Sequence, residues 1–436
     1  MKHQPAMEFG LRFGHTAGVT ALALLLGACG PSDAPATAGA GSQATSAAGT
    51  EQDLANAVVY QGARLIVGDG SAALENATVV VQDGRFTAVG LSNEVTVPVG
   101  AARVDLTGAT LMPALIDTHT HLSTAHEALR EDLRRRATYG VSAAMSLGSD
   151  DSEAVFAVRD AAEPGIALYR TAGRGITSPE PGRSEIPHWV TTEAEARKAV
   201  REEVARQVDI IKIWVDDRNG QYDKLSPALF GAVIDEAHDN DLLVTAHIFA
   251  LEDAKALLRA GVDAFAHGVR DQDIDDEFVA LIQERPEVVL VPNLAGRGVA
   301  TDLEWLRGTI PDEQLQQLQN APTGQPAVLE AFGIQARNLA RLHEAGVRIA
   351  LGTDGNTPWG SHIEMEDMVA AGMSPMAVLT AATGNGAAFM GLDERGTIAT
   401  GKVADFLVLE ANPLDDITNT RRIREVYLAG EPVARP

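Results

Sequence analysis

Residues 111–122 read Leu-Met-Pro-Ala-Leu-Ile-Asp-Thr-His-Thr-His-Leu, an apolar run that ends in two histidines, His119 and His121. In a β-strand, side chains two positions apart point to the same side, so both imidazoles are expected to project together from one strand end. Two ligands of one metal ion require this geometry. Because a His-x-His pattern alone also arises by chance, the interpretation depends on finding further ligands at the ends of other strands.

Composition limits the classes of protein and of metal site. The chain has 436 residues, 45% of them hydrophobic, which is enough for a large core and more than one domain. Its formal net charge of -25 argues against nucleic acid or anionic lipid as a partner. A single cysteine excludes an intramolecular disulfide and a thiolate cluster. Any metal must therefore be held by nitrogen and oxygen ligands.

The N-terminus has the features of an export signal. An apolar run at 17–28 follows basic residues, and it is too short to span a bilayer as a helix. The run ends in Leu-Gly-Ala-Cys29, which resembles a bacterial lipobox. We expect a signal peptide over 1–28, lipidation at Cys29 and a flexible linker over 29–55, giving a lipid-anchored periplasmic protein. The alternative is an ordinary cleaved signal peptide and a soluble periplasmic or secreted protein.

Both ends of the remaining chain are rich in short β-type runs. Within 56–111 such runs alternate with turns, among them Asp83-Gly84, and 398–436 shows the same character. Asp-Gly between two such runs is a strong hairpin signal. The two ends are therefore predicted to form one small β-sandwich.

The central part, residues 112–397, alternates apolar strands with amphipathic helical patterns. Helical patterns are predicted at 192–207, 226–240, 251–260 and 325–345. Eight strands that alternate with helices indicate an α/β fold of the (β/α)8 TIM-barrel type. The eight strands are predicted at 111–117, 141–147, 166–171, 210–215, 243–246, 264–266, 288–291 and 348–352.

Further candidate ligands follow the predicted strands, at the end where barrel enzymes place their chemistry. Lys212 lies inside an apolar strand, where its charge is costly unless it is removed or paired. His247 and His267 close the next two strands, and Asp354 follows the last one. Five strands thus deliver metal-competent side chains to the same rim.

This set, in this order, resembles the amidohydrolase superfamily over roughly residues 56–436, and its prolidase-like and imidazolonepropionase-like group in particular. Segments such as Asp209-Ile-Ile-Lys-Ile and Gly352-Thr-Asp carry the likeness to that group. The resemblance implies two divalent ions, most commonly zinc, with manganese, iron or cobalt as alternatives. It also implies that CO2 converts Lys212 to a bridging carbamate. The implied ligands are His119, His121 and Asp354 for the first ion and His247 and His267 for the second, with Lys212 shared.

The resemblance implies hydrolysis of an amide in a small molecule. A hydroxide held between the two ions would attack the carbonyl, and Asp354 would pass the proton to the leaving nitrogen. Expected substrates are Xaa-Pro dipeptides, N-acyl amino acids or an amide-bearing toxin. Alternatives are a mononuclear imidazolonepropionase-like or deaminase-like enzyme, a lactone or phosphotriester hydrolase, and a solute-binding lipoprotein. The last is disfavoured because all six site residues are intact.

Four residues are candidates for binding substrate: Tyr169, Arg183, Tyr222 and His362. The chain departs from the family pattern in the loop 176–183, where a Gly-Gly-His sequence is usual, so the family's substrate does not carry over. Homo-oligomers are expected only by analogy with other barrels.

Overall fold

The computed structural model describes residues 56–161, 163–294 and 296–435. The predicted signal peptide, the lipidated Cys29 and the linker lie outside these residues. None of the helices described is both long and apolar enough to cross a membrane.

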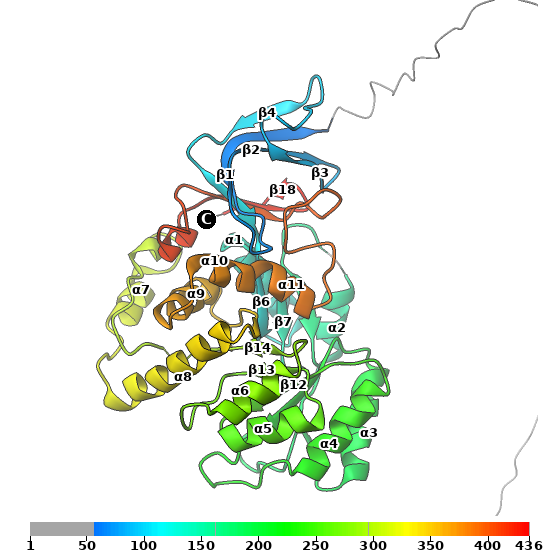
Figure 1. Cartoon of the computed structure of the whole chain (residues 1–436). Helices are drawn as coiled ribbons and strands as arrows, with labels where there is room; N and C mark the ends of the chain where they lie inside the picture. The colour runs from blue at the N-terminus through cyan, green and yellow to red at the C-terminus, as the bar shows by residue number, and fades with distance from the viewer. Residues whose placement is uncertain (1–55, 162, 295, 436) are drawn as a thin grey trace, which may run out of the picture. The chain divides into compact units, whose positions relative to one another are not determined.

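Strands from both ends of the described chain lie in one eight-stranded sheet (Figure 1). β1 pairs with β2 antiparallel, and β16 joins the two ends by pairing with β5 antiparallel. Phe406 stacks on Tyr427 with ring centroids 4.4 Å apart. The sequence predicted a sandwich, whereas hydrogen bonds unite these strands in a single sheet. Its members are β1 (Val58–Leu65), β2 (Leu74–Gln82), β3 (Arg85–Leu91), β4 (Ala102–Asp105), β5 (Thr110–Pro113), β16 (Phe406–Leu409), β17 (Ile423–Leu428) and β18 (Glu431–Pro432).

The strand predicted over 111–117 is divided in the structure. β5 belongs to the sheet of the chain ends, and β6 (Leu115–Thr120) pairs with β7 parallel. At the break, the Ala114 N–H donates to the Asp405 carbonyl at 3.1 Å, and the Leu115 N–H donates to the Gly140 carbonyl at 2.8 Å. The run is buried throughout, so hydrophobic periodicity could not show that the chain changes partners there.

The central strands form two parallel groups, β6-β7-β8 and β10-β9-β11-β12-β13-β14-β15. Every residue of β6 and β7 is buried, as expected for parallel strands covered on both faces. Each predicted strand after the first overlaps an observed one. The remaining bounds are β7 (Val141–Ser146), β8 (Leu168–Thr171), β9 (Ile176–Thr177), β10 (His188–Trp189), β11 (Ile211–Val215), β12 (Val244–Ile248), β13 (Ala264–Ala266), β14 (Val289–Val291) and β15 (Arg348–Ile349).

Helices follow most of these strands, and Figure 1 shows α3 to α6 in sequence along the parallel strands. The predicted start at Thr192 is a capping box with Glu195, and Ser226 caps α4 ahead of Pro227. The helices are α1 (His126–Thr138), α2 (Glu153–Asp160), α3 (Glu193–Ala205), α4 (Pro227–His238), α5 (Leu251–Ala260), α6 (Asp276–Gln283), α7 (Asp312–Gln319), α8 (Pro326–Glu344), α9 (Gly360–Ala370), α10 (Pro375–Thr380) and α11 (Gly386–Phe389). Two 3-10 helices are η1 (Glu304–Leu306) and η3 (Ile417–Arg421), and η2 (Ala381–Asn385) is a π-helix between α10 and α11.

Candidate metal and catalytic site

Three histidines surround the carboxylate of Asp354. His119 and His121, at the end of β6 and just beyond it, place their Nε2 atoms 3.1 Å and 3.0 Å from its Oδ1. His267, which follows β13, places its Nε2 atom 3.5 Å from Oδ2. The tertiary structure thus brings the His-x-His pair together with two ligands predicted far along the chain.

The backbone is strained at two of these residues. Asp354 has φ 52° and His267 has φ 98°, in the left-handed region that residues other than glycine rarely adopt. Strained backbone of this kind is kept only where the surrounding structure holds it in place, and it is found mostly at functional sites. The strain therefore supports a functional assignment for both side chains.

A buried ion pair holds the residues on either side of Asp354. Asp117, on β6, accepts hydrogen bonds from the Thr353 N–H at 3.1 Å and the Thr353 hydroxyl at 2.8 Å. Arg136 donates to Asp117 at 3.0 Å and to the Gly355 carbonyl at 2.7 Å. Both charged side chains are fully buried. The pair therefore fixes the loop after β15 against β6.

His119 is prepared as a neutral nitrogen ligand. Its Nδ1 lies 2.8 Å from Asn293 Oδ1, which fixes Nδ1 as the protonated nitrogen and leaves the Nε2 lone pair free. The Nε2 atom is near Asp354, but without hydrogen-bond geometry. Burial lowers the pKa of His119 to about 4, so the imidazole is neutral at pH 7.

Lys212 and His247 complete the predicted set. The Lys212 side chain is 1% exposed, and among the described residues its Nζ has no hydrogen-bond partner. Burial lowers the pKa of Lys212 to about 7, while the charge of Asp354 acts in the opposite direction. The His247 ring lies 4.6 Å from the His267 ring, and its Nε2 lies 3.0 Å from Asp216 Oδ2.

The donors present fit a divalent cation. Ligand atoms of His119, His267 and Asp354 all lie within 4.8 Å of one another, and His121 approaches the same Asp354 oxygen. Neutral imidazoles and a carboxylate suit zinc and its neighbours in the first transition row. Among the described residues, three buried atoms of the predicted set have no hydrogen-bond partner: Lys212 Nζ, His119 Nε2 and His267 Nδ1.

Two predicted substrate residues are buried and fully engaged elsewhere. The Tyr169 hydroxyl donates to Asp150 Oδ2 at 2.6 Å. Both nitrogens of His362 are engaged, Nε2 with the Tyr139 carbonyl at 2.9 Å and Nδ1 with the Thr420 hydroxyl at 3.1 Å. These contacts give Tyr169 and His362 packing roles and leave neither polar group free for substrate.

The other two predicted substrate residues lie nearer the surface. Arg183 is exposed and pairs with Glu180 at 2.6 Å, and the half-buried Tyr222 donates to the Pro181 carbonyl at 3.2 Å. Glu180 also accepts from Arg218, 3.0 Å away. The loop that carries Arg183 is therefore tied to the loop after β11, and substrate binding by Arg183 and Tyr222 stays a prediction.

Sequence reasoning missed three polar residues beside His247: Asp216, Arg218 and Arg270. Asp216 follows β11 directly, and Arg270 lies four residues beyond the end of β13. Their position just past strand ends was the available signal, since chemistry in such folds collects there. They were not singled out because charged loop residues are common.

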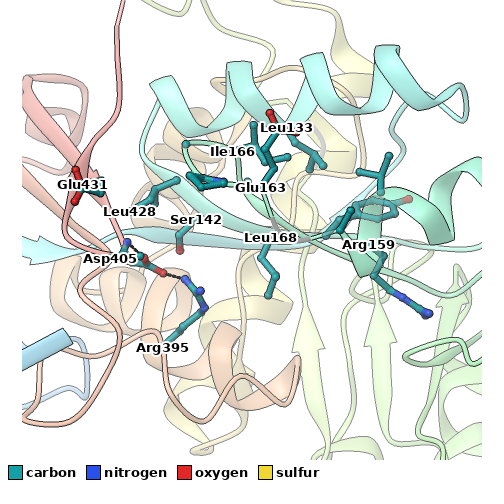
Figure 2. Close-up of a pocket in the computed structure, with 17 residues that line it drawn as sticks. Leu133, Ser142, Arg159, Glu163, Ile166, Leu168, Arg395, Asp405, Leu428 and Glu431 are labelled. Carbon is teal, nitrogen blue, oxygen red and sulfur yellow. Dashed lines mark hydrogen bonds and ion pairs between the residues drawn. The ribbon is translucent and has the colours of Figure 1, made fainter. Parts of the chain in front are cut away.

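A separate cavity of about 300 Å³ lies away from these ligands (Figure 2). It is lined by Ser142 and Leu168, near the starts of β7 and β8, and by the ion pair of Arg395 with Asp405. The candidate ligands follow the opposite ends of the strands. The cavity is therefore not part of the candidate site.

Comparison with known proteins agrees with this geometry. The Amidohydrolase family model matches residues 110–433, and the chain belongs to that family. An imidazolonepropionase of Deinococcus radiodurans is 27% identical over 82% of this chain and 92% of its own length. An ochratoxinase of Aspergillus niger is 25% identical over 83% of this chain and 82% of its own. A Bifidobacterium longum structure provisionally assigned as a prolidase is similar at TM-score 0.73 and 31% identity, covering 88% of this chain and 96% of that one. The protein is a hydrolase of C–N bonds.

Proposed function

We propose that the protein is a binuclear metal-dependent amidohydrolase that cleaves an amide bond in a dipeptide-like or N-acyl amino-acid substrate. The observation that carries the proposal is the buried Lys212 amine, which has no hydrogen-bond partner among the described residues. The negative charge of Asp354 is near enough to act on the pKa of this amine. A buried polar group without a partner is costly. Reaction of Nζ with CO2 forms a C–N bond with loss of one proton, and the product is an anion with two oxygens that can bind two cations.

In this proposal His119, His121 and Asp354 hold one zinc ion, His247 and His267 hold the other, and the Lys212 carbamate is shared. When bound, the ions supply a water-derived nucleophile at neutral pH and polarise the scissile carbonyl. Asp354 accepts the proton of the attacking water and delivers it to the leaving nitrogen. Asn293 and Asp216 keep the rings of His119 and His247 in their ligating orientations.

The proposal includes closure of the parallel strands into a (β/α)8 barrel. The Thr118 N–H donates to the Leu351 carbonyl at 2.9 Å, which links the β6 side to the segment after β15. The Asp209 N–H donates to the Thr171 carbonyl at 2.9 Å, which links β8 to the segment before β11. These bonds support closure on both sides and would place all six candidate ligands at one rim.

Metal analysis combined with a Lys212→Ala variant tests the proposal. We expect about two divalent ions per wild-type chain and loss of at least one ion, with most of the activity, in the variant. Added acetate should restore part of both, because it supplies the missing carboxylate. Lys198→Met, at an exposed lysine that pairs with Glu202, should keep its metal. Full activity in Lys212→Ala would refute the bridging role.

A mononuclear, imidazolonepropionase-like enzyme is the second candidate. The compact cluster of His119, His267 and Asp354, together with the Deinococcus relative, favours it. The same metal measurement separates the two candidates, because this one predicts about one ion per chain that survives the Lys212 substitution.

We also propose that the protein is a periplasmic lipoprotein anchored through Cys29. The sequence that ends at Cys29 supports this location. Fractionation of cells that express a Cys29→Ser variant tests it, and undiminished membrane association of that variant would contradict it.

A further inference from the structure

Two arginines from different loops meet at His247. Arg218 follows β11, and its Nη1 lies 3.1 Å from His247 Nε2. Arg270 follows β13, and its Nη2 lies 3.2 Å from the same atom. Because the His247 ring lies 4.6 Å from that of His267, these cations stand beside the proposed metal centre.

The two arginines differ in how their charge is balanced. Arg218 pairs with Asp216 at 2.6 Å and with Glu180 at 3.0 Å. In the described part of the chain Arg270 makes no ion pair. Its Nη2 donates to the Ile248 carbonyl at 2.9 Å, and its buried Nε has no hydrogen-bond partner among the residues described. Burying a guanidinium without a directly paired anion costs free energy. Arginine is also the side chain best suited to bind a carboxylate, because its guanidinium can donate two parallel hydrogen bonds.

An aromatic surface adjoins this cation. The Arg270 guanidinium lies over the Phe249 ring, 5.4 Å from its centroid, and Phe249 is 37% exposed. One face of the guanidinium is thereby covered, so an incoming anion meets its edge. The exposed remainder of Phe249 offers apolar contact next to the anion.

We propose that Arg270, with Arg218 beside it, binds the free carboxylate of an N-acyl α-amino acid, and that Phe249 contacts an apolar side chain of that amino acid. This assignment rests on the proposed amidohydrolase function and names its substrate class. His267 lies between His247, which both arginines contact, and Asp354. Its ring is 4.6 Å from that of His247, and its Nε2 is 3.5 Å from Asp354 Oδ2. The anion site therefore lies close to the proton-transfer residue, as a carboxylate two bonds from the leaving nitrogen requires.

Paired substrates test the proposal in the metal-loaded full-length enzyme. N-acetyl-L-phenylalanine carries the carboxylate, and N-acetyl-L-phenylalaninamide presents the same scissile bond without it. Arg270→Gln should lower kcat/KM for the acid by about 10- to 100-fold, mainly through KM, and change that for the amide by less than about threefold. Arg270→Lys should restore part of the preference for the acid.

Arg337→Gln provides the control, because Arg337 is an exposed residue of α8 that pairs with Asp273. Metal content must match across the variants. An equal loss on both substrates would show a structural role for Arg270 and overturn the proposal, as would a wild-type enzyme that hydrolyses both substrates equally well.

A binding measurement separates this proposal from the proposed reaction. Calorimetry with 3-phenylpropanoate should show binding to the wild type that weakens at least tenfold in Arg270→Gln, whereas 3-phenylpropan-1-ol should bind weakly to both. If that pattern holds while no amide is hydrolysed, the anion site stands and the proposed reaction fails. If amides are hydrolysed while 3-phenylpropanoate binds both proteins equally, the anion site fails and the reaction stands.

Discussion

At the scale of single residues, the Asp117–Arg136 pair shows how a buried charge supports the site without touching substrate. Its hydrogen bonds reach Thr353 and Gly355, on both sides of the strained Asp354. These hydrogen bonds hold Asp354 in a fixed position relative to His119. The pair is therefore a positioning element, and its removal is expected to affect both stability and turnover.

Arg136→Met should lower the free energy of unfolding by about 3–5 kcal/mol, because it leaves the charge of Asp117 buried and unpaired. Urea denaturation measures the loss, and kcat should fall as Asp354 loses its fixed position. The double variant Asp117→Asn/Arg136→Met should recover part of the stability. Arg130→Met, at a partly exposed arginine that pairs with Glu127 and Glu163, should change stability by less than about 1 kcal/mol. A similar loss of stability in Arg136→Met and Arg130→Met would contradict the assignment of the Asp117–Arg136 pair as a positioning element.

The buried imidazole of His362 is expected to make the protein less stable in acid. Burial lowers its pKa from 6.5 to about 4, although the hydrogen bond to Tyr139 acts in the opposite direction. As the pH falls below 6.5, His362 binds a proton in the unfolded chain but stays neutral in the folded protein until about pH 4. Protonation therefore favours the unfolded chain, and the free energy of unfolding decreases between pH 6.5 and about pH 4. Between pH 7 and 4.5 the difference is about 2–3 kcal/mol.

His362→Gln should reduce the pH dependence of the unfolding free energy by that amount, although it destabilises the protein at every pH. Denaturation of both proteins at a series of pH values measures the difference in slope. Parallel curves for the two proteins would show that His362 titrates normally in the folded state.

At the scale of elements, helix starts were readable because their chemistry is local. The α3 capping box uses only Thr192 and Glu195, which lie three residues apart. The division of the 111–117 run at Ala114 was not readable, because β5 and β6 find partners far away in the sequence. Short apolar runs indicate burial and do not show which neighbour buries them.

Thr192→Ala should lower the free energy of unfolding by about 1 kcal/mol, since the Glu195 N–H loses its acceptor. Thermal or urea denaturation measures this change. Thr192→Ser keeps the accepting oxygen and should remain close to the wild type. An alanine variant as stable as the serine variant would mean that the cap contributes nothing.

At the scale of the whole molecule, the sheet of the chain ends packs on the parallel strands. Leu407 of β16 is fully buried in the main core, and its side chain fills the space beside Gly140, where an added Cβ would lie 2.8 Å from it. Gly140 has φ 84° in the turn before β7. Both parts therefore contribute side chains to the main core, and we expect them to unfold together.

Leu407→Ala should lower the free energy of unfolding by about 2–5 kcal/mol through the cavity it leaves. Leu318→Ala, at a 37% exposed position on α7, should change stability by less than about 0.5 kcal/mol. Near- and far-ultraviolet circular dichroism should report one coincident transition. Two separate transitions would show that the parts are independent.

Local sequence patterns were sufficient to predict the α/β class, most strand positions and the six candidate ligands. These follow from local patterns: apolar runs, caps, and histidines or carboxylates just beyond strand ends. Three findings required the folded structure. His119, His121 and His267 meet at Asp354, and the polar groups of Tyr169 and His362 bind other residues. Arg218 and Arg270 both contact His247. The physical reason is that hydrogen-bond partners and charge balance depend on residues distant in the chain, which no local pattern contains.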